Sequence, residues 1–292
     1  MLLQGYAKGD NAMAIIVNTN MSALKTQNNL NSATNLLNSS LERMSTGLKI
    51  NRAADDAAGM YVATNLETQI RGSKIAQSNV ETGINVLQTV EGNLDVINDN
   101  LLRIRDLCVQ GANGVYNADS YLAMKNEIDG RLAEISRISD SAEFNGLKLL
   151  DGSINNDLTL QVGANGDANN QIKVDKSVFA DVDAAALTGA ATSTFTSAGD
   201  ATTLLNKIDE ALDKVTKRKA TIGATQNRLN SAQASLVTTI ENASAAKSTI
   251  MDADISQEAA DFTKAQILQQ TSATLLTQAN QLPALALQLV AG

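Results

Sequence analysis

Hydrophobic residues recur every three or four positions along most of the chain, the spacing of one face of an α-helix. The longest such series contains Val80, Ile84, Leu87, Val90, Leu94, Ile97, Leu101, Ile104 and Cys108. No proline interrupts this series, which predicts one helix from about Gly59 to Gly111. At 1.5 Å per residue the helix would be about 75 Å long, so other helices must support it from the side.

A second, shorter helix is predicted after the turn-forming residues 111–120. Its apolar positions are Leu122, Ile128, Leu132, Ile135 and Ile138. We expect Asp119 or Ser120 to cap its N-terminus, because a short polar side chain can accept a hydrogen bond from the first free backbone N–H groups.

The C-terminal half contains a stricter repeat of seven residues, which is typical of coiled-coil packing. Its members are Ile208, Val215, Ile222, Leu229, Leu236, Ala243 and Ile250. The positions four residues further on are mixed, for example Leu212 and Lys219. The apolar seam is therefore narrow and predicts a bundle of several helices. The predicted bundle core includes Leu87, Leu94, Leu101, Ile222, Leu229 and Leu236.

Both ends of the chain carry similar repeats. The N-terminal repeat contains Ala23, Leu30, Leu37 and Met44, with Leu41 beside it; the C-terminal repeat contains Leu268, Leu275, Leu282 and Leu289, beside a stripe of Ala265, Ser272, Ala279 and Ala286. Small residues let helices approach closely, and leucines supply apolar area. The remaining faces carry Asn, Gln, Ser and Thr, which suits them to burial against neighbouring subunits. We predict that these leucines and Met44 mediate self-assembly.

The middle of the chain has a different pattern. Apolar residues alternate at Leu158, Leu160 and Val162, and again at Ile172 and Val174, which predicts a β-hairpin. Residues 176–200 are rich in Ala, Thr, Ser and Asp and are interpreted as a short variable surface linker. The predicted fold class is mainly α: a long antiparallel helical bundle or coiled coil from the N- and C-terminal segments, with a small β-hairpin region in the middle.

Composition excludes several kinds of chemistry. The chain has no histidine, which removes the usual acid–base catalyst and the commonest metal ligand. The single cysteine, Cys108, excludes an intramolecular disulfide and a cysteine-cluster zinc site and is interpreted as a buried small hydrophobe. Asp55 and Asp56 are adjacent acids, interpreted as a solvated turn or as partners of Arg52. With no catalytic motif, we expect no enzymatic activity, cofactor or metal.

Charge and hydropathy limit the possible partners. The net charge of −8 argues against a nucleic-acid partner, which would require a basic face. The longest apolar stretch, residues 282–292, is too short to cross a bilayer, so no membrane partner is expected. Residues 1–12 do not resemble a cleaved signal peptide.

Several segments, in order along the chain, resemble bacterial flagellins. They are NTNMSALKTQNNL, LERMSTGLKINRAADDAAGMYVA, GINVLQTVEGNLDVINDNLLRIRDLCVQGANG, EFNGLKLLDG, LTLQVGANG, IGATQNRLNSA and DADISQEAADFTKAQILQQTSATLLTQANQLPALALQLV. The resemblance implies an inner domain from residues 13–57 and 251–292. It also implies a rod domain of three long helices and a β-hairpin from residues 58–175 and 201–250.

The resemblance also implies a function: a structural subunit that polymerises into the flagellar filament for swimming motility. Flagellins leave the cell through the flagellar type III apparatus with an uncleaved signal, so an extracellular filament is the expected location. Expected partners are other subunits, an export chaperone, the filament cap and hook–filament junction proteins. Because the family typically begins at a sequence like that of Met13 and Ala14, residues 1–12 are interpreted as an extension or as a start codon placed too early.

Two alternatives stay open at the level of sequence. A hook–filament junction protein would share the terminal helices, although FTKAQILQQ and NRAADDAAG fit a filament flagellin better. A cytoplasmic coiled-coil adaptor would carry charged residues beside its seam, and the termini do not.

The segment LLRIRDLCVQGAN resembles the flagellin patch that a host Toll-like receptor binds. The matching positions are Arg103, Leu107 and Glu127, on two neighbouring rod helices. Structural roles are equally open to them: Leu107 can pack in the bundle, and Arg103 can form an ion pair with Glu127. Asp106 stands where the patch usually has Glu.

Overall fold

The computed structural model describes residues 19–188 and 195–291, and for residues 282–291 it describes the backbone only. Residues 1–12 and Met13 lie outside this range. The chain is mainly helical with two short antiparallel strand pairs, which confirms the predicted fold class. It divides into two compact units, residues 66–245 and residues 1–65 with 246–292. The predicted boundaries were 57/58 and 250/251.

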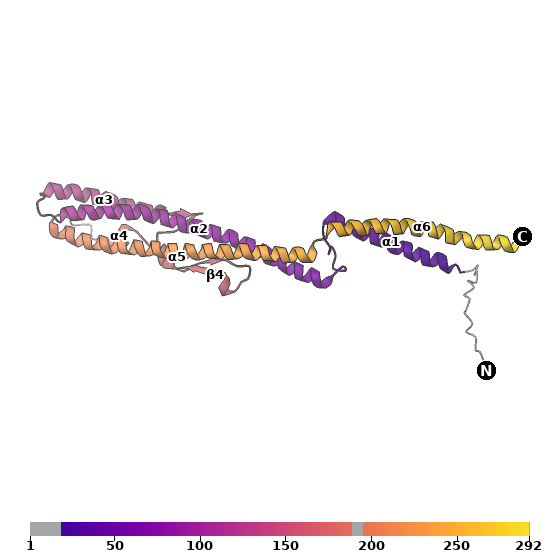
Figure 1. Cartoon of the computed structure of the whole chain (residues 1–292). Helices are drawn as coiled ribbons and strands as arrows, with labels where there is room; N and C mark the ends of the chain where they lie inside the picture. Colours follow the sequence, from indigo (N-terminus) through magenta and orange to yellow (C-terminus); the bar gives the residue numbers. More distant parts are fainter. Residues whose placement is uncertain (1–18, 189–194, 292) are drawn as a thin grey trace, which may run out of the picture. The chain divides into compact units, whose positions relative to one another are not determined.

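Three long helices form the unit of residues 66–245. They are α2 (Ala57–Gly111), α3 (Ala118–Ser141) and α5 (Ala198–Met251), of which α2 and α5 extend a few residues into the other unit. Figure 1 shows the three helices running side by side. Ion pairs join their surfaces: Arg105 Nε lies 2.7 Å from Asp209 Oδ1, and Lys219 pairs with Asp95. The predicted helix 59–111 therefore exists and starts two residues earlier.

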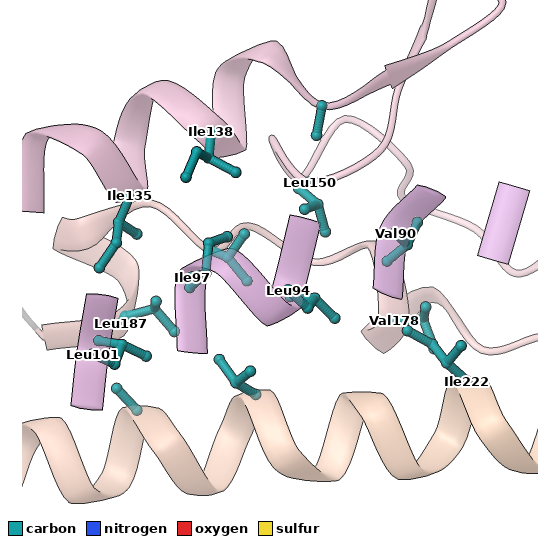
Figure 2. Close-up of a cluster of buried hydrophobic side chains, with 14 of the residues drawn as sticks. Val90, Leu94, Ile97, Leu101, Ile135, Ile138, Leu150, Val178, Leu187 and Ile222 are labelled. Atoms are coloured by element: carbon teal, nitrogen blue, oxygen red, sulfur yellow. The ribbon is translucent and has the colours of Figure 1, made fainter. Parts of the chain in front are cut away.

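Apolar residues from all three helices meet in one continuous core. The six predicted core residues, Leu87, Leu94, Leu101, Ile222, Leu229 and Leu236, are at most 7% exposed. Figure 2 shows Leu94, Ile97 and Leu101 of α2 facing Ile135 and Ile138 of α3. The three- and four-residue steps place these side chains on one stripe of each helix, which explains why they are buried together.

The start of α3 differs from the prediction. Asn117 caps it, and its Oδ1 accepts a 2.9 Å hydrogen bond from the backbone N–H of Ser120. Leu122 is 56% exposed, whereas Tyr121 and Met124 are buried. Six residues separate Leu122 from Ile128, and at roughly 100° per residue this places Leu122 about 120° away from the buried face.

In the sequence, the two strand pairs lie between α3 and α5. Strand β1 (Glu143–Phe144) pairs with β2 (Leu147–Lys148) through a tight turn with positive φ at Asn145 and Gly146, a conformation that these two residue types tolerate best. Strand β3 (Leu158–Gln161) pairs with β4 (Gln171–Val174), with Leu158 opposite Val174. The predicted hairpin is confirmed, and its connection includes the short 3₁₀-helix η1 (Ala168–Asn170).

Two glycines on α2 let the β3–β4 hairpin lie close against that helix. A Cβ at Gly83 would be 2.5 Å from Leu160 Cδ1, and one at Gly72 would be 2.7 Å from Ala164 Cβ and 3.1 Å from Ala164 Cα. The neighbour of Gly83 is the end of a flexible leucine, but the neighbour of Gly72 includes backbone. Of these two glycines, Gly72 is therefore the one that cannot accept a side chain unless the hairpin connection moves.

We expect Gly72→Ala to lower the thermal stability of the protein and Gly92→Ala to raise it. Alanine at either position strengthens α2 by about 1 kcal/mol, and nothing lies within 4 Å of a Cβ at Gly92. At Gly72 the clash with Ala164 costs about 1–3 kcal/mol, which outweighs that gain. Thermal unfolding followed by circular dichroism would measure both; a stabilising Gly72→Ala would contradict the close packing.

The predicted surface linker 176–200 contributes to the core instead. It contains the 3₁₀-helix η2 (Lys176–Phe179), helix α4 (Ala184–Thr188) and the start of α5, and residues 189–194 lie outside the described range. Its buried apolar side chains are Val178, Phe179, Val182, Leu187 and Phe195. Arg218 of α5 also holds this segment, donating to the carbonyls of Ala180 and Asp181. The apolar residues are too widely and irregularly spaced to show a period in the sequence.

Helices α1 (Met21–Thr46) and α6 (Ile255–Ala291) form most of the other unit. They lie side by side and antiparallel (Figure 1). At one end Asn20 Nδ2 donates to the carbonyl of Ala279 at 2.7 Å, and at the other Arg43 pairs with Glu258 at 3.2 Å. These contacts fix the register of the two helices.

Candidate assembly surface

The contact between α1 and α6 is made largely by small side chains. Besides Glu258, which pairs with Arg43, the buried residues on the facing sides are Ala33, Ser40, Ala265, Ser272 and Ala279, each at most 8% exposed. Three of them belong to the predicted small-residue stripe; the side chain of its fourth member, Ala286, lies outside the described residues. Small residues let the helices approach closely, but each buries little apolar area.

The large apolar residues of the predicted repeats are only partly covered by this contact. Leu30, Leu37 and Met44 are half-buried, whereas Leu41, Leu268 and Leu275 are 55%, 43% and 51% exposed. The side chains of Leu282 and Leu289 lie outside the described residues.

Further exposed apolar residues on the same two helices are Met21, Leu24, Leu36, Ile255 and Ile267. The seven-residue repeats do not predict these five residues, because they lie at positions between the repeats. Each is an apolar residue among amide and hydroxyl residues of a helix, and this pattern could have identified them as part of the surface.

The surface around these leucines has no charged side chain over long stretches. There is none between Lys25 and Glu42 and none after Lys264. Burying one exposed leucine is worth roughly 1.5–3 kcal/mol, and an uncharged surface adds no cost of desolvating ions. The pair α1–α6 is therefore chemically suited to be covered by another protein surface.

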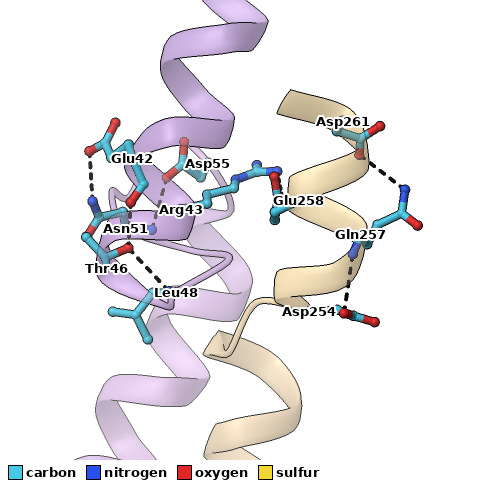
Figure 3. A network of polar contacts seen from close by, with 10 residues as sticks. All are labelled: Glu42, Arg43, Thr46, Leu48, Asn51, Asp55, Asp254, Gln257, Glu258 and Asp261. Carbon is cyan, nitrogen blue, oxygen red and sulfur yellow. Dashed lines mark hydrogen bonds and ion pairs between the residues drawn. The ribbon is translucent and has the colours of Figure 1, made fainter. Parts of the chain in front are cut away.

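The end of the α1–α6 pair is held by a polar turn (Figure 3). Gly47, with φ of 71°, ends α1 and donates its N–H to the carbonyl of Arg43 at 2.8 Å. Asp55 Oδ2 accepts from the backbone N–H groups of Asn51 and Arg52, and these hydrogen bonds hold the pKa of that carboxyl below its usual value. The Arg52 guanidinium pairs with Glu42 rather than with an aspartate.

Two of the three residues of the predicted receptor patch, Arg103 and Glu127, are brought together where α2 and α3 run side by side. Arg103 Nε donates to Glu127 Oε1 at 3.0 Å, and Arg131 lies 3.3 Å from the same oxygen. The hydrogen bond from Arg103 is the main cause that holds the pKa of Glu127 below its usual value. Leu107 is 3% exposed, so of these three residues only Arg103 and Glu127 are accessible to a partner in the single chain.

Cys108 is buried in the core of the bundle, where burial raises the pKa of its thiol to about 12. A thiol with such a pKa is protonated near neutral pH and is a poor nucleophile. Within the residues that the structure describes, no three His, Cys, Asp or Glu side chains are grouped as metal ligands. Across the same part of the chain no helix is long and apolar enough to cross a membrane.

Two family models match the chain. The bacterial flagellin N-terminal helical region matches residues 17–155, and the bacterial flagellin C-terminal helical region matches residues 205–290. Together they span most of the sequence, including all of α1, α2 and α3 and nearly all of α5 and α6.

Individual relatives give the same result. A flagellar filament 31.3 kDa core protein from Treponema maltophilum is 36% identical over 276 residues, covering 91% of this chain and 96% of the relative. A flagellin from Halalkalibacterium halodurans is 37% identical over 277 residues, covering 94% of this chain and 100% of the relative.

Among solved structures, a putative flagellar hook-associated protein from Vibrio parahaemolyticus is 16% identical with a TM-score of 0.57. The match covers 68% of this chain and 100% of that one, and at this identity it shows the fold alone. The two family models and the relatives in full-length alignment go further: the chain belongs to the bacterial flagellin family and is a structural subunit of the flagellar filament, not an enzyme.

Proposed function

We propose that this chain is exported by the flagellar type III apparatus and polymerises outside the cell through α1 and α6 into a filament that serves swimming. The observation that carries the proposal is the set of exposed apolar side chains, Leu41, Leu268 and Leu275 among them, on helices with long charge-free stretches. Such side chains gain free energy only when another surface covers them.

The proposal assigns different roles to the two units. Residues 66–245 have a continuous apolar core with buried leucines from three helices, and for this reason we expect them to fold without a partner. The α1–α6 pair buries mainly alanine and serine, so it depends on neighbouring subunits for most of its apolar contact. Polymerisation therefore completes the packing of the terminal helices.

The second candidate is a hook–filament junction protein. The likeness to the Vibrio hook-associated protein, at 16% identity, concerns the fold alone and does not discriminate between the two candidates. A junction protein occupies a limited number of positions, whereas a filament subunit adds to its own kind without limit. Unlimited growth of the purified protein is the behaviour that favours the filament subunit.

Electron microscopy of the purified protein, with and without residues 254–292, tests the proposal. We expect the full chain to form long filaments and the shortened chain to form none, because the deletion removes α6 and exposes the whole inner side of α1. Helical circular dichroism and cooperative unfolding of the remaining bundle serve as the control for folding. Filaments that persist after the deletion would contradict assembly through α6.

The export chaperone, the filament cap and the hook–filament junction proteins are proposed as partners in assembly. They would need to recognise the same terminal helices before or during polymerisation, because these helices carry the exposed apolar residues of the α1–α6 pair. The extracellular filament is the proposed location.

A host Toll-like receptor is a further proposed partner, through Arg103, Leu107 and Glu127. We expect Arg103→Ala to weaken receptor activation by monomeric protein about tenfold, since a central interface arginine contributes more than 1 kcal/mol. A reporter-cell assay measures the effect. Arg137→Ala is the matched control, because among the described residues Arg137 forms its ion pair with Glu134 of its own helix and not across two helices. Equal signalling by the two variants would remove Arg103 from the receptor surface.

A further inference from the structure

A hollow of about 370 Å³ lies in the unit of residues 66–245, where the connection of the β3–β4 hairpin meets α2 and α5. Its volume is within the range of sites that bind small molecules. Gly163 in the connection shapes one wall, because a Cβ at this position would overlap the side-chain oxygen of Asn170. We call this hollow the amide hollow, after the Asn and Gln side chains around it.

Ser73 of α2 is the residue that sets the amide hollow apart. It is only 2% exposed, and its hydroxyl forms no hydrogen bond within the described part of the chain. The other buried serines and threonines of the same unit are bonded: Ser139, Thr188 and Thr225 each donate to a backbone carbonyl. Because an unused hydroxyl in a protein interior costs free energy, Ser73 needs a partner from outside the chain.

The hydroxyl of Ser73 opens onto the amide hollow. Among the described residues, every side-chain N or O that is sealed from solvent has a hydrogen-bond partner. The small exposed area of Ser73 must therefore include its Oγ, and the hollow that Ser73 lines is the space it reaches. Ser40 and Ser272 are also buried without a side-chain hydrogen bond, but they belong to the contact between α1 and α6.

The other polar side chains around the amide hollow are uncharged. They are the amides of Gln69, Asn165, Asn169 and Asn170 and the hydroxyls of Ser235 and Thr239. Unused amides are common on the surface of this chain, so none of them indicates a site by itself. Here they gather around one buried hydroxyl that lacks a partner, and no charged side chain lines the same space.

This lining selects among ligands. An ion would be desolvated without an opposite charge, and an apolar molecule would leave the hydroxyl and the amides without hydrogen bonds. A molecule with many hydroxyl groups satisfies both, because hydroxyls and amides each donate and accept. Val162 and Leu236, at most 9% exposed, add a small apolar area on which C–H groups can rest.

We propose that the amide hollow binds a neutral sugar. Ser73 and the amides of the hairpin connection hydrogen-bond its hydroxyl groups, while Val162 and Leu236 contact its C–H face. The site lies within the helical bundle and uses no residue of α1 or α6. It is therefore independent of the proposed polymerisation and is tested on the monomer.

Titration of the full-length monomer with N-acetylglucosamine, followed by NMR of the side-chain amide groups, tests the site. This sugar is neutral, and its acetamido group adds a donor, an acceptor and a methyl group. We expect saturable shifts at Asn165, Asn169 and Asn170, with a Kd on the order of 1 mM, because each new hydrogen bond replaces one to water. Glucuronate should bind about tenfold more weakly, since its carboxylate would meet no cation in the hollow. Shifts that do not saturate, or equal binding of both sugars, would overturn the proposal.

Ser73→Ala separates binding from stability. We expect the Kd to rise about 3- to 10-fold with the loss of one hydrogen bond. The Tm should stay equal or rise, because alanine leaves no unpaired hydroxyl and is the better helix residue. Ser78→Ala is the matched control: Ser78 lies on α2, is exposed and does not line the hollow, so binding should not change. A lower Tm with unchanged binding would mean that the Ser73 hydroxyl serves packing, and would overturn the proposal.

Asn169→Ala provides a second test, because Asn169 is exposed and its amide makes no hydrogen bond within the described residues. We expect the Kd to rise several-fold while the bundle remains folded. Asn126→Ala removes an exposed amide from α3, outside the hollow, and should leave the Kd unchanged. Equal binding by the Ser73, Asn169 and control variants would place the sugar elsewhere and overturn the site.

Discussion

Replacing Leu268 and Leu275 together by aspartate is expected to abolish polymerisation while leaving the helical bundle folded. Both side chains are about half exposed in the single chain, so the substitution removes little packing within it. They lie seven residues apart on α6, and therefore on one side of that helix. Lys264 is one helical turn before position 268 and can pair with the new carboxylate there, whereas α6 has no basic side chain after Lys264 to pair with the one at position 275.

The expected effect is large because two costs act together. Because both leucines are already about half covered, burying the rest of them in a filament contributes roughly 1.5–3 kcal/mol in total, and this contribution is lost. The carboxylate at position 275 would in addition have to be desolvated with no basic side chain of α6 beside it, which costs several kcal/mol more. Since about 1.4 kcal/mol corresponds to a factor of ten in an equilibrium constant, the critical concentration should rise beyond any that can be reached in solution.

Sedimentation of polymer from monomer measures the result, and Val115→Asp is the control. Val115 is 78% exposed and lies in the turn after α2, outside α1 and α6, so we expect its replacement to leave sedimentation near that of wild type. Circular dichroism should show the same bundle in both variants. Filament formation by the Leu268, Leu275 variant would place these leucines on a surface that stays in water.

Periodicity in the sequence predicts the long helices and their buried faces because each apolar stripe is long and uninterrupted. Leu94 and Leu101 on α2 and Ile222 and Leu229 on α5 are all buried. The hairpin is equally predictable, since alternation at Leu158 and Leu160 is the pattern of a half-covered strand. The long helices and the hairpin are predictable because their apolar residues repeat with a regular spacing over several turns or residues.

Features that depend on tertiary contact could not be predicted in the same way. Val178, Phe179 and Phe195 are buried by packing against the helices, and their own segment has no period that would reveal it. The predicted N-caps of α3, Asp119 and Ser120, lie two and three residues after the observed N-cap, Asn117. All three residue types are good N-caps, and which of them caps the helix depends on where the backbone first becomes helical.

The assembly surface was only partly visible for a related reason. Heptad spacing identifies Leu268 and Leu275, but spacing does not tell which side of α6 meets α1. The structure shows that Ala265, Ser272 and Ala279 face α1, which leaves the leucines at the edge of this contact and about half exposed. Which residues of α6 face α1 and which stay exposed depends on how the two helices pack, so neither helix sequence shows it alone.

The bundle should respond to Leu94→Ala far more strongly than to Val96→Ala. Leu94 is fully buried, and Figure 2 shows it beside Ile97 and Leu150. A leucine-to-alanine change at such a site costs about 3–5 kcal/mol, because it removes transfer free energy and leaves a cavity among side chains that cannot collapse completely.

Thermal unfolding of the monomer provides the measurement. For a unit of the size of residues 66–245, about 3–5 kcal/mol corresponds to a fall in Tm of about 6–20 °C. Val96 lies on the same helix two residues away and is 49% exposed, so its truncation should stay within about 0.5 kcal/mol. Similar shifts from both variants would mean that the buried stripe of α2 does not carry the stability of the bundle. A large fall in Tm from Leu94→Ala alone would mean that the regularly spaced apolar residues that predict α2 also stabilise the bundle.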